Sequence, residues 1–268
     1  MVLAKYSVVI VGVFSSFLLF LTASTAESQE NPTGFLAFGA SNQSDFEGSE
    51  DYEVGPFLAA RAAFRGVQFE LEGVQGRLDI SPYQNVGFGP AFNFRFGRDD
   101  DVENDQVAAL PEIDDATELG AFLRYGQPIG LASGDEGVVR LDILFDVSDV
   151  YSGYVAELSA AYTFRPTSRL GLTTGVSTRY VSEDYADTYF SITNEGAVES
   201  GLRQFTAGEG FDSVGLNLTA TYQLNDRWGL IANASVQNLI GDSADSPIVD
   251  DAGSDTQTFA GLGVTYSF

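Results

Sequence analysis

The sequence predicts an all-β fold: an antiparallel, up-and-down transmembrane β-barrel of 10 or 12 strands with long acidic loops. Apolar and polar residues alternate over segments of ten or eleven residues, which is longer than soluble strands usually are and long enough for a tilted strand to cross a bilayer. The polar face of these segments is rich in Gly, Ser, Thr, Asn and Gln, as a barrel lumen would be, and aromatic residues cluster beside the short turns, where an interfacial girdle is expected. Alternation alone would also fit a soluble β-sandwich; strand length, polar face and girdle favour the membrane barrel.

Residues 1–26 are predicted to form a cleavable secretory signal peptide, and residues 27–268 a single barrel domain. Lys5 supplies a positive start, Ser7 to Leu21 is almost wholly apolar, and Ser24-Thr25-Ala26 provides small residues before the cleavage point. A membrane anchor is the alternative, but the apolar run is shorter than the roughly 20 residues that span a bilayer. An exported chain made of strands is expected to close on itself in the outer membrane of a Gram-negative cell, because no sheet edge can be left unpaired in lipid.

The individual strands follow a period of two. Between Val214 and Leu224 the even positions are apolar, and the odd positions are Gly, Asn, Thr or Gln, which is typical of a strand with two unlike faces. Residues 257–268 repeat this pattern. Comparable segments lie at 54–64, 67–74, 86–96, 117–125, 138–148, 154–164, 170–180 and 228–239, with a shorter one at 34–41. No stretch after the signal peptide has a convincing helical period.

The strand count stays open at this stage. These eleven candidates are an odd number, whereas a bacterial barrel normally has an even number of strands. Omitting 34–41 gives ten, and adding a short strand from Asp187 to Thr193 gives twelve. The side on which the loops before residue 116 lie depends on the answer.

The charge of the chain is strongly acidic. A net charge of −25, from 38 acidic and 13 basic residues, argues against nucleic-acid binding because phosphates could not be neutralised. Many of the acids lie in segments 45–53, 97–115 and 240–255; the last two, together with 181–212, are expected to be outer loops. Carboxylates there could bind Ca²⁺ or Mg²⁺, but no segment has the spacing and glycine of a calcium-binding loop, which favours a solvated acidic surface. No metal or other cofactor is predicted.

Two residue types are absent, and this limits the chemistry. With no histidine and no cysteine, the chain has no Ser–His arrangement, no catalytic thiol, no disulfide and neither of the common zinc ligands. Paired acids such as Asp114-Asp115 do not indicate acid–base catalysis here, because the chain has too many acidic residues for one pair to be informative. The glycines around Leu262 lie within a strand rather than before a helix, so they do not predict a phosphate-binding loop. The sequence therefore predicts a protein without enzymatic activity.

The polar faces of the strands carry a candidate lumen charge network of five arginines and six carboxylates. Its members are Arg61, Arg95, Arg124, Arg140, Arg179, Glu70, Glu72, Glu118, Asp142, Asp146 and Glu157. These charges would either fill a narrow barrel as compensated ion pairs or line a charged pore constriction. We favour filling, because a barrel this small leaves little open bore.

The end of the chain holds a candidate assembly signal. The last strand closes on Gly263-Val264-Thr265-Tyr266-Ser267-Phe268, with aromatic residues at the last and third-last positions. Gly263, Tyr266 and Phe268 in this arrangement resemble the C-terminal signal that the barrel-assembly machinery recognises.

Five segments stand out in order along the chain: SDFEGSEDYEVGP (Ser44 to Pro56), GPAFNFRFGRD (Gly89 to Asp99), EIDDATELGAFLRY (Glu112 to Tyr125), DTYFSIT (Asp187 to Thr193) with SGL (Ser200 to Leu202), and Gly241 to Phe268. Their order and spacing resemble the MltA-interacting protein (MipA/OmpV) family of outer-membrane proteins. Phe46 stands where that family has tyrosine, and Ser191-Ile192 where it usually has glycine-valine.

The resemblance implies an outer-membrane barrel without enzymatic activity, in a family that has no established catalytic or ligand residues. Members are described as scaffolds that join a lytic transglycosylase to a murein synthase, and others as adhesion-related surface proteins. We therefore expect a scaffold in contact with outer-membrane lipid, the barrel-assembly machinery and a peptidoglycan hydrolase or synthase. A porin-like channel for small solutes, lined by the charge network, and a surface adhesion protein are the alternatives.

Overall fold

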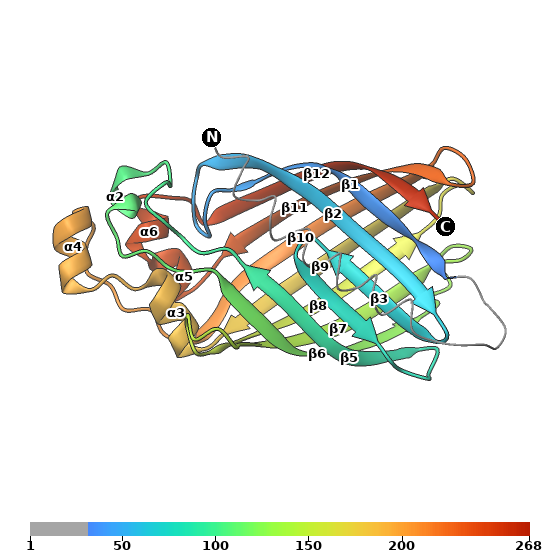
Figure 1. The fold of residues 1–268 in the computed structure, drawn as a ribbon, viewed down its shortest axis with the longest axis horizontal. Coiled ribbons are helices and arrows are strands. Elements are labelled where there is room, and N and C mark those ends of the chain that lie inside the picture. The colour runs from blue at the N-terminus through green and yellow to red at the C-terminus, as the bar shows by residue number, and fades with distance from the viewer. Residues whose placement is uncertain (1–31) are drawn as a thin grey trace, which may run out of the picture. The chain divides into compact units, whose positions relative to one another are not determined.

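The computed structural model describes residues 32–268, which form one closed antiparallel barrel of twelve strands (Figure 1). The predicted signal peptide at 1–26 lies outside the described residues. Each strand pairs with its neighbours in sequence, and β1 closes the barrel against β12. The strands are β1 (Thr33–Ser44), β2 (Tyr52–Phe64), β3 (Val67–Glu72), β4 (Gln75–Asp79), β5 (Val86–Arg95), β6 (Ala116–Gln127), β7 (Glu136–Asp146), β8 (Tyr154–Phe164), β9 (Leu170–Val181), β10 (Gly210–Gln223), β11 (Trp228–Leu239) and β12 (Thr256–Ser267).

The all-β barrel and the higher of the two strand counts are confirmed, but the place expected for the twelfth strand is wrong. The weak candidate at 34–41 is a full strand, β1, and the strand that the sequence did not reveal is β4. β4 has only five residues and follows β3 after a tight turn at Gly73, whose φ of 61° suits glycine. A single candidate at 67–74 therefore hid a short hairpin. Asp187 to Thr193 is not a strand, because most of it belongs to a helix.

The two ends of the barrel differ, and we call them the cap end and the turn end. The cap end carries the three longest connections, at 96–115, 182–209 and 240–255, as well as those at 45–51 and 147–153 and the short β3–β4 turn. The turn end carries connections at 65–66, 80–85, 128–135, 165–169 and 224–227, none of them longer than eight residues. With twelve strands, the acidic segments 45–53, 97–115 and 240–255 all lie at the cap end. The loops at 45–51 and 96–115, whose side could not be decided from the sequence, are therefore on the same side as 240–255.

The cap end contains five short helices, so the expectation of no helix is wrong. They are α2 (Asp105–Ala108), α3 (Glu183–Phe190), α4 (Asn194–Ser200), α5 (Asp242–Asp245) and α6 (Pro247–Asp250), and Figure 1 shows them gathered at the same end. Local capping starts several of them: the side chains of Asn104, Ser182 and Thr193 accept backbone N–H groups of the first turn. Helices of four to eight residues are too short to show a period in the sequence. Within residues 32–268 no helix has the length and apolar character needed to cross a bilayer.

The outer face of the barrel is apolar, as contact with lipid requires. Large hydrophobic side chains such as Leu216, Leu218 and Leu262 lie exposed on this face. At the turn end the aromatic rings predicted as a girdle contact one another: Trp228 meets Tyr266 edge-on at 5.1 Å between ring centroids. Tyr162 and Phe164 stack at 5.7 Å.

Closure of the barrel depends on a close approach of β1 and β12 at Gly39, which lies opposite Gly263. A Cβ atom on Gly39 would overlap the backbone of Leu262 and Gly263. We therefore expect Gly39→Ala to prevent closure, leaving most of the protein with the gel mobility of the unfolded form. Gly210→Ala is the matched control, because a Cβ there meets nothing within 4 Å. If both variants showed the same heat-modifiable gel mobility, barrel closure would not depend on the close approach of β1 and β12 at Gly39.

Candidate functional site

The inward-facing charges form two clusters inside the barrel. The lumen cluster, in the middle of the barrel, consists of Arg61, Glu70, Glu72, Arg77, Arg140 and Asp142. The mouth cluster, at the cap end, consists of Glu47, Arg95, Glu118, Arg179 and Asp212. Strand register creates part of each cluster, since Arg61 lies opposite Glu70 and Glu70 opposite Arg77.

Arg77 is the centre of the lumen cluster. Its Nε donates to Asp142 Oδ1 at 2.6 Å, and its Nη1 donates to Glu72 Oε2 at 3.0 Å. Arg77 belongs to β4 and Asp142 to β7, so the ion pair joins strands that are not neighbours. Their side chains are only 5% and 3% exposed, which shows that the bore is filled at this level.

Glu70 is shared by three arginines of the lumen cluster. Its carboxylate accepts from Arg61 Nη2 and from Arg140 Nη2, each at 2.8 Å, and lies 3.7 Å from Arg77 Nη1. One carboxylate therefore compensates several guanidinium groups, and the lumen cluster acts as one network rather than as separate pairs.

The mouth cluster ties a cap segment to the barrel wall. Arg179 Nε donates to Asp212 Oδ1 at 2.9 Å, and Arg179 Nη2 binds both Asp212 and Glu47. Arg95 Nε donates to Glu118 Oε1 at 2.8 Å, and its Nη1 lies 3.5 Å from Glu47 Oε2. Glu47, which precedes β2 in the cap, thus bridges arginines of β5 and β9.

Tyrosine side chains complete the mouth cluster. The hydroxyl of Tyr185 on α3 donates to Glu47 Oε2, and that of Tyr151 donates to Glu118 Oε1 at 2.9 Å. The guanidinium carbon of Arg95 lies 4.9 Å from the centre of the Tyr185 ring, and that of Arg179 lies 5.6 Å away. Both distances allow cation–π attraction, which is stronger where water is excluded.

These contacts set the protonation of the cap groups. Burial alone would raise the pKa of Glu47, but Arg179, Arg95 and the hydrogen bond from Tyr185 hold it below its ordinary value. Burial raises the pKa of Tyr185 well above its ordinary value. Glu47 is therefore a carboxylate and Tyr185 a neutral donor, which is the pairing that the hydrogen bond needs.

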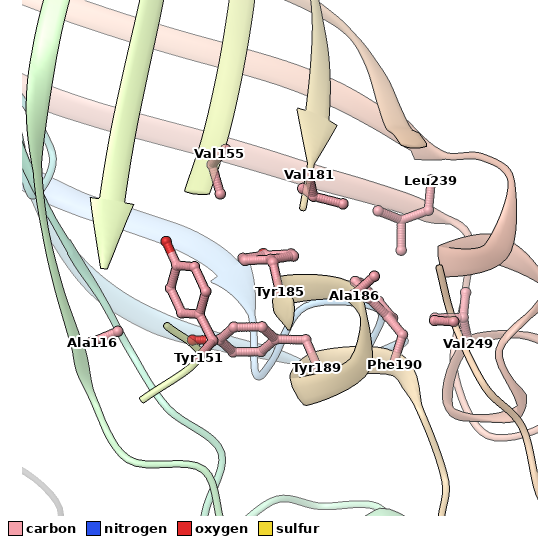
Figure 2. Close-up of a cluster of buried hydrophobic side chains, with 11 residues drawn as sticks. Ala116, Tyr151, Val155, Val181, Tyr185, Ala186, Tyr189, Phe190, Leu239 and Val249 are labelled. Atoms are coloured by element: carbon pink, nitrogen blue, oxygen red, sulfur yellow. The ribbon is translucent and has the colours of Figure 1, made fainter. Parts of the chain in front are cut away.

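An apolar layer around α3 closes the mouth on the cap side of these charges. Figure 2 shows Tyr185, Tyr189 and Phe190 of α3 beneath Val181 and Leu239, which lie at the cap ends of β9 and β11. Tyr185 and Phe190 are fully buried. Their cluster also includes Ala116, Tyr151, Val155, Ala186, Ala207 and Val249. Residues from several parts of the rim therefore meet at the mouth of the barrel, and we infer that they seal the lumen.

A second apolar cluster holds the cap segments to one another. It joins Phe46, Val107, Leu110, Ile192, Leu202, Ile248 and Ala252. These residues come from four different connections at the cap end, so the cap has a core of its own. Phe46, one of the residues that depart from the family pattern, is among its buried members.

Acidic side chains also link the cap segments through backbone groups. Asp45 Oδ2 accepts the N–H of Glu103 at 3.1 Å, and Asp242 Oδ2 accepts that of Gly208 at 2.8 Å. Burial raises the pKa of Asp45. Across the described part of the chain, no three acidic side chains are grouped so that they could hold a metal ion.

Three members of the predicted charge network lie apart from the two clusters. Arg124 pairs with Glu136 at 2.6 Å, nearer the turn end. Glu157 lies opposite Arg179 on the inner wall. Asp146 accepts the N–H groups of Tyr151 and Ser152 at 2.7 and 2.9 Å, so it orders the 147–153 connection instead of pairing with an arginine.

Three central residues were missed from the sequence. Arg77 lies on the short strand β4, where the alternation Gly-Arg-Leu-Asp was the available signal. Glu47 lies in an acidic segment that was read as a solvated loop, and Asp212 in a segment read as an outer loop. Nothing in the local sequence marks either acid as an ion-pair partner, because Glu47 meets Arg179 from 132 positions away and Asp212 lies at an irregularity of the β9–β10 register.

The candidate assembly residues lie at the closing seam. Phe268 and Gly34 exchange backbone hydrogen bonds at 3.1 and 3.2 Å, which joins the chain end to β1. Tyr266 contacts Trp228 across the β11–β12 pair. Their recognition by assembly machinery stays a prediction.

Comparison with known proteins gives a consistent result. The sequence signature of the family described as MltA-interacting protein MipA matches residues 36–268. Outer membrane protein YiaT of Escherichia coli is 31% identical over 114 residues, 42% of this chain and 46% of that protein. The MltA-interacting protein of Escherichia coli is 27% identical over 135 residues, 49% of this chain and 51% of that protein. OmpV of Vibrio cholerae is 35% identical over 89 residues, one third (33%) of each chain. The matched segments thus span about half or less of these relatives.

Two solved structures align with the chain at low identity. The NanC porin aligns with a TM-score of 0.46 at 9% identity, over 87% of this chain and 98% of that one. The translocator domain of the autotransporter NalP from Neisseria meningitidis also has a TM-score of 0.46 at 9% identity, over 96% of both chains.

Proposed function

The chain belongs to the MltA-interacting protein family of the outer membrane, and from this premise we propose that it is a non-enzymatic scaffold for peptidoglycan-remodelling enzymes. One relative is named for its interaction with MltA, and the resemblance implies partners of the lytic transglycosylase and murein synthase classes. The chain carries no histidine or cysteine, which supports a binding role over a catalytic one.

The observation that carries the proposal is the packing of the apolar layer and the mouth cluster at the cap end, from which we infer a sealed mouth. Tyr185, Phe190, Glu118 and Asp212 are almost wholly buried there, and the mouth cluster fixes the cap to the wall. A barrel closed in this way has no straight path for a solute, which supports binding at its ends over conduction. Barrels of this kind place short turns in the periplasm and long loops outside, so the turn end would face the peptidoglycan.

The turn end offers a pre-organised contact at the 128–135 connection. The buried carboxylate of Asp135 accepts the N–H groups of Gly130, Leu131 and Ala132 and the hydroxyl of Tyr162, all within 3.0 Å. This holds Leu131 outward with 80% of its surface exposed. A rigid turn that presents a large apolar side chain suits protein recognition, because little entropy is lost on binding. We assign the partner contact to this turn.

Chemical crosslinking in cell envelopes tests the scaffold. Crosslinking followed by mass spectrometry is expected to recover a lytic transglycosylase or a murein synthase with the wild-type protein. Leu131→Glu should reduce that recovery several-fold, since it places a charge in the apolar contact. Val198→Glu is the matched control: Val198 is 79% exposed but lies on α4 at the cap end. Recovery of neither enzyme class with the wild type, or equal loss in both variants, would refute the proposal.

The order of the 128–135 turn should depend on pH through Asp135. The backbone N–H bonds from Gly130 and its neighbours, with the Tyr162 hydroxyl, lower the pKa of Asp135 to about 2, below the ordinary value of about 3.9. Its stabilising effect is therefore complete above the ordinary pKa and is lost as the pH falls through 2. Amide exchange is expected to show protection of Leu131 at pH 5 that is lost in Asp135→Asn. Unchanged protection in the variant would show that the turn is ordered by other contacts.

A further inference from the structure

The barrel contains a solvent-open cavity on the turn-end side of the lumen cluster. Its volume is about 50 Å³, and its lining includes Arg61, Glu70, Arg77, Asp79, Arg124 and Arg140. Arg61 is 57% exposed, whereas Arg77, paired with Asp142, is nearly buried. The cavity is therefore a pocket entered from the turn end and closed toward the cap.

Hydrogen-bond donors exceed acceptors on the wall of this cavity. Each of its four guanidinium groups carries five N–H donors, while the acidic side chains of the lining are Glu70 and Asp79. Asp79 is already engaged, since its Oδ1 accepts the N–H groups of Ser81 and Phe88 at 2.9 and 3.3 Å. Glu70 is divided among three arginines, so the guanidinium donors outnumber the acidic acceptors in the wall of the cavity.

Two features of Arg140 point to a missing acceptor. Its Nε is buried and makes no hydrogen bond within the described residues. A buried donor without an acceptor costs free energy and is rare in folded proteins. Arg140 also lies directly opposite Arg124 in the β6–β7 register, and like charges in that position repel. A bound anion between the two guanidinium groups would reduce this repulsion.

We propose that this cavity binds a small solute bearing a carboxylate, whose two oxygens accept N–H groups from Arg140, Arg124 and Arg61. A planar carboxylate matches the fork of a guanidinium, and such charge-assisted pairs are strong. Phe122 supplies an apolar wall for the rest of the solute.

The size and charge of the site select a compact ligand. Glu72, Glu136 and Asp142 pair with the arginines from outside the lining, so the charge of the four arginines is fully compensated and a ligand meets only their remaining N–H donors. It therefore fits a solute with one carboxylate better than a polyanion. This binding site is independent of the scaffold proposal, because it lies inside the barrel and not on the 128–135 turn.

Binding is measured with N-acetylglycine and its uncharged analogue N-acetylglycinamide, using the purified full chain in detergent micelles and saturation-transfer NMR. Saturable binding of the carboxylate but not of the amide is expected. Arg140→Gln and Arg124→Gln should each weaken it at least about tenfold, as loss of a charge-assisted hydrogen bond does. Arg203→Gln, whose side chain lies in the cap and contacts Asp250 and Asp251, should bind as the wild type does.

Heat-modifiable gel mobility establishes that each variant is folded before it is titrated. Arg124→Gln serves if Arg140→Gln fails to fold, because among residues 32–268 Arg124 has a single carboxylate partner, Glu136. Equal binding of acid and amide, no saturable binding by the wild type, or wild-type affinity in a folded Arg124→Gln variant would overturn the proposal.

Discussion

Replacing Arg179 with methionine is expected to lower the free energy of unfolding by about 3–5 kcal/mol, the usual cost of removing one partner from a buried ion pair. The substitution leaves Asp212 and Glu47 inside the mouth without their shared cation. Methionine keeps most of the side-chain volume, so the decrease in the free energy of unfolding measures the loss of the positive charge rather than a loss of packing. Urea titration in lipid vesicles, followed by the fluorescence of Trp228, which is the one tryptophan of the chain, measures the change.

Arg203→Met is the control for this substitution. Arg203 pairs with Asp250 and Asp251, but all three side chains are about half exposed or more, and exposed pairs of this kind contribute at most about 1 kcal/mol. A similar loss in both variants would mean that the mouth cluster is solvated, which contradicts the sealed mouth.

Phe190→Ala is expected to cost about 3–5 kcal/mol, because it removes a fully buried aromatic side chain from the centre of the apolar layer. The effect should be confined to the cap, since the strand ladder does not depend on α3. Limited trypsin digestion in vesicles should then cut after Arg203 at a lower urea concentration than in the wild type.

Val198→Ala is the matched control on the neighbouring helix α4. Val198 is exposed and belongs to neither apolar cluster of the cap, so its truncation should change stability by no more than about 0.5 kcal/mol. If Phe190→Ala is cut no faster than Val198→Ala, the apolar layer does not hold the cap closed.

The barrel could be predicted because its main signal is local. Alternation over 214–224 identifies β10, and the structure has β10 at Gly210–Gln223; the period of two is imposed by the pleat itself. The same signal failed for β4, whose five residues are too few to alternate convincingly. The sequence also did not reveal α3, whose buried face of Tyr185, Ala186, Tyr189 and Phe190 spans only two turns.

The charge clusters could be predicted only in part, since they depend on contacts between distant segments. Arg61 and Glu70 lie on paired neighbouring strands, so alternation alone places both on the inner face. The contact between Glu47 and Arg179 joins residues 132 positions apart and exists only once the cap folds onto the closed barrel. For that reason Glu47 looked like one more solvated acid of an acidic loop.

Electrical recording from purified wild-type protein in planar lipid bilayers tests the sealed mouth most directly. Because the mouth cluster and the apolar layer around α3 fill the cap end, the folded barrel should give no conductance steps above those of the bare membrane. Stable, reproducible steps from protein with the gel mobility of the folded form would contradict the account and make the barrel a channel.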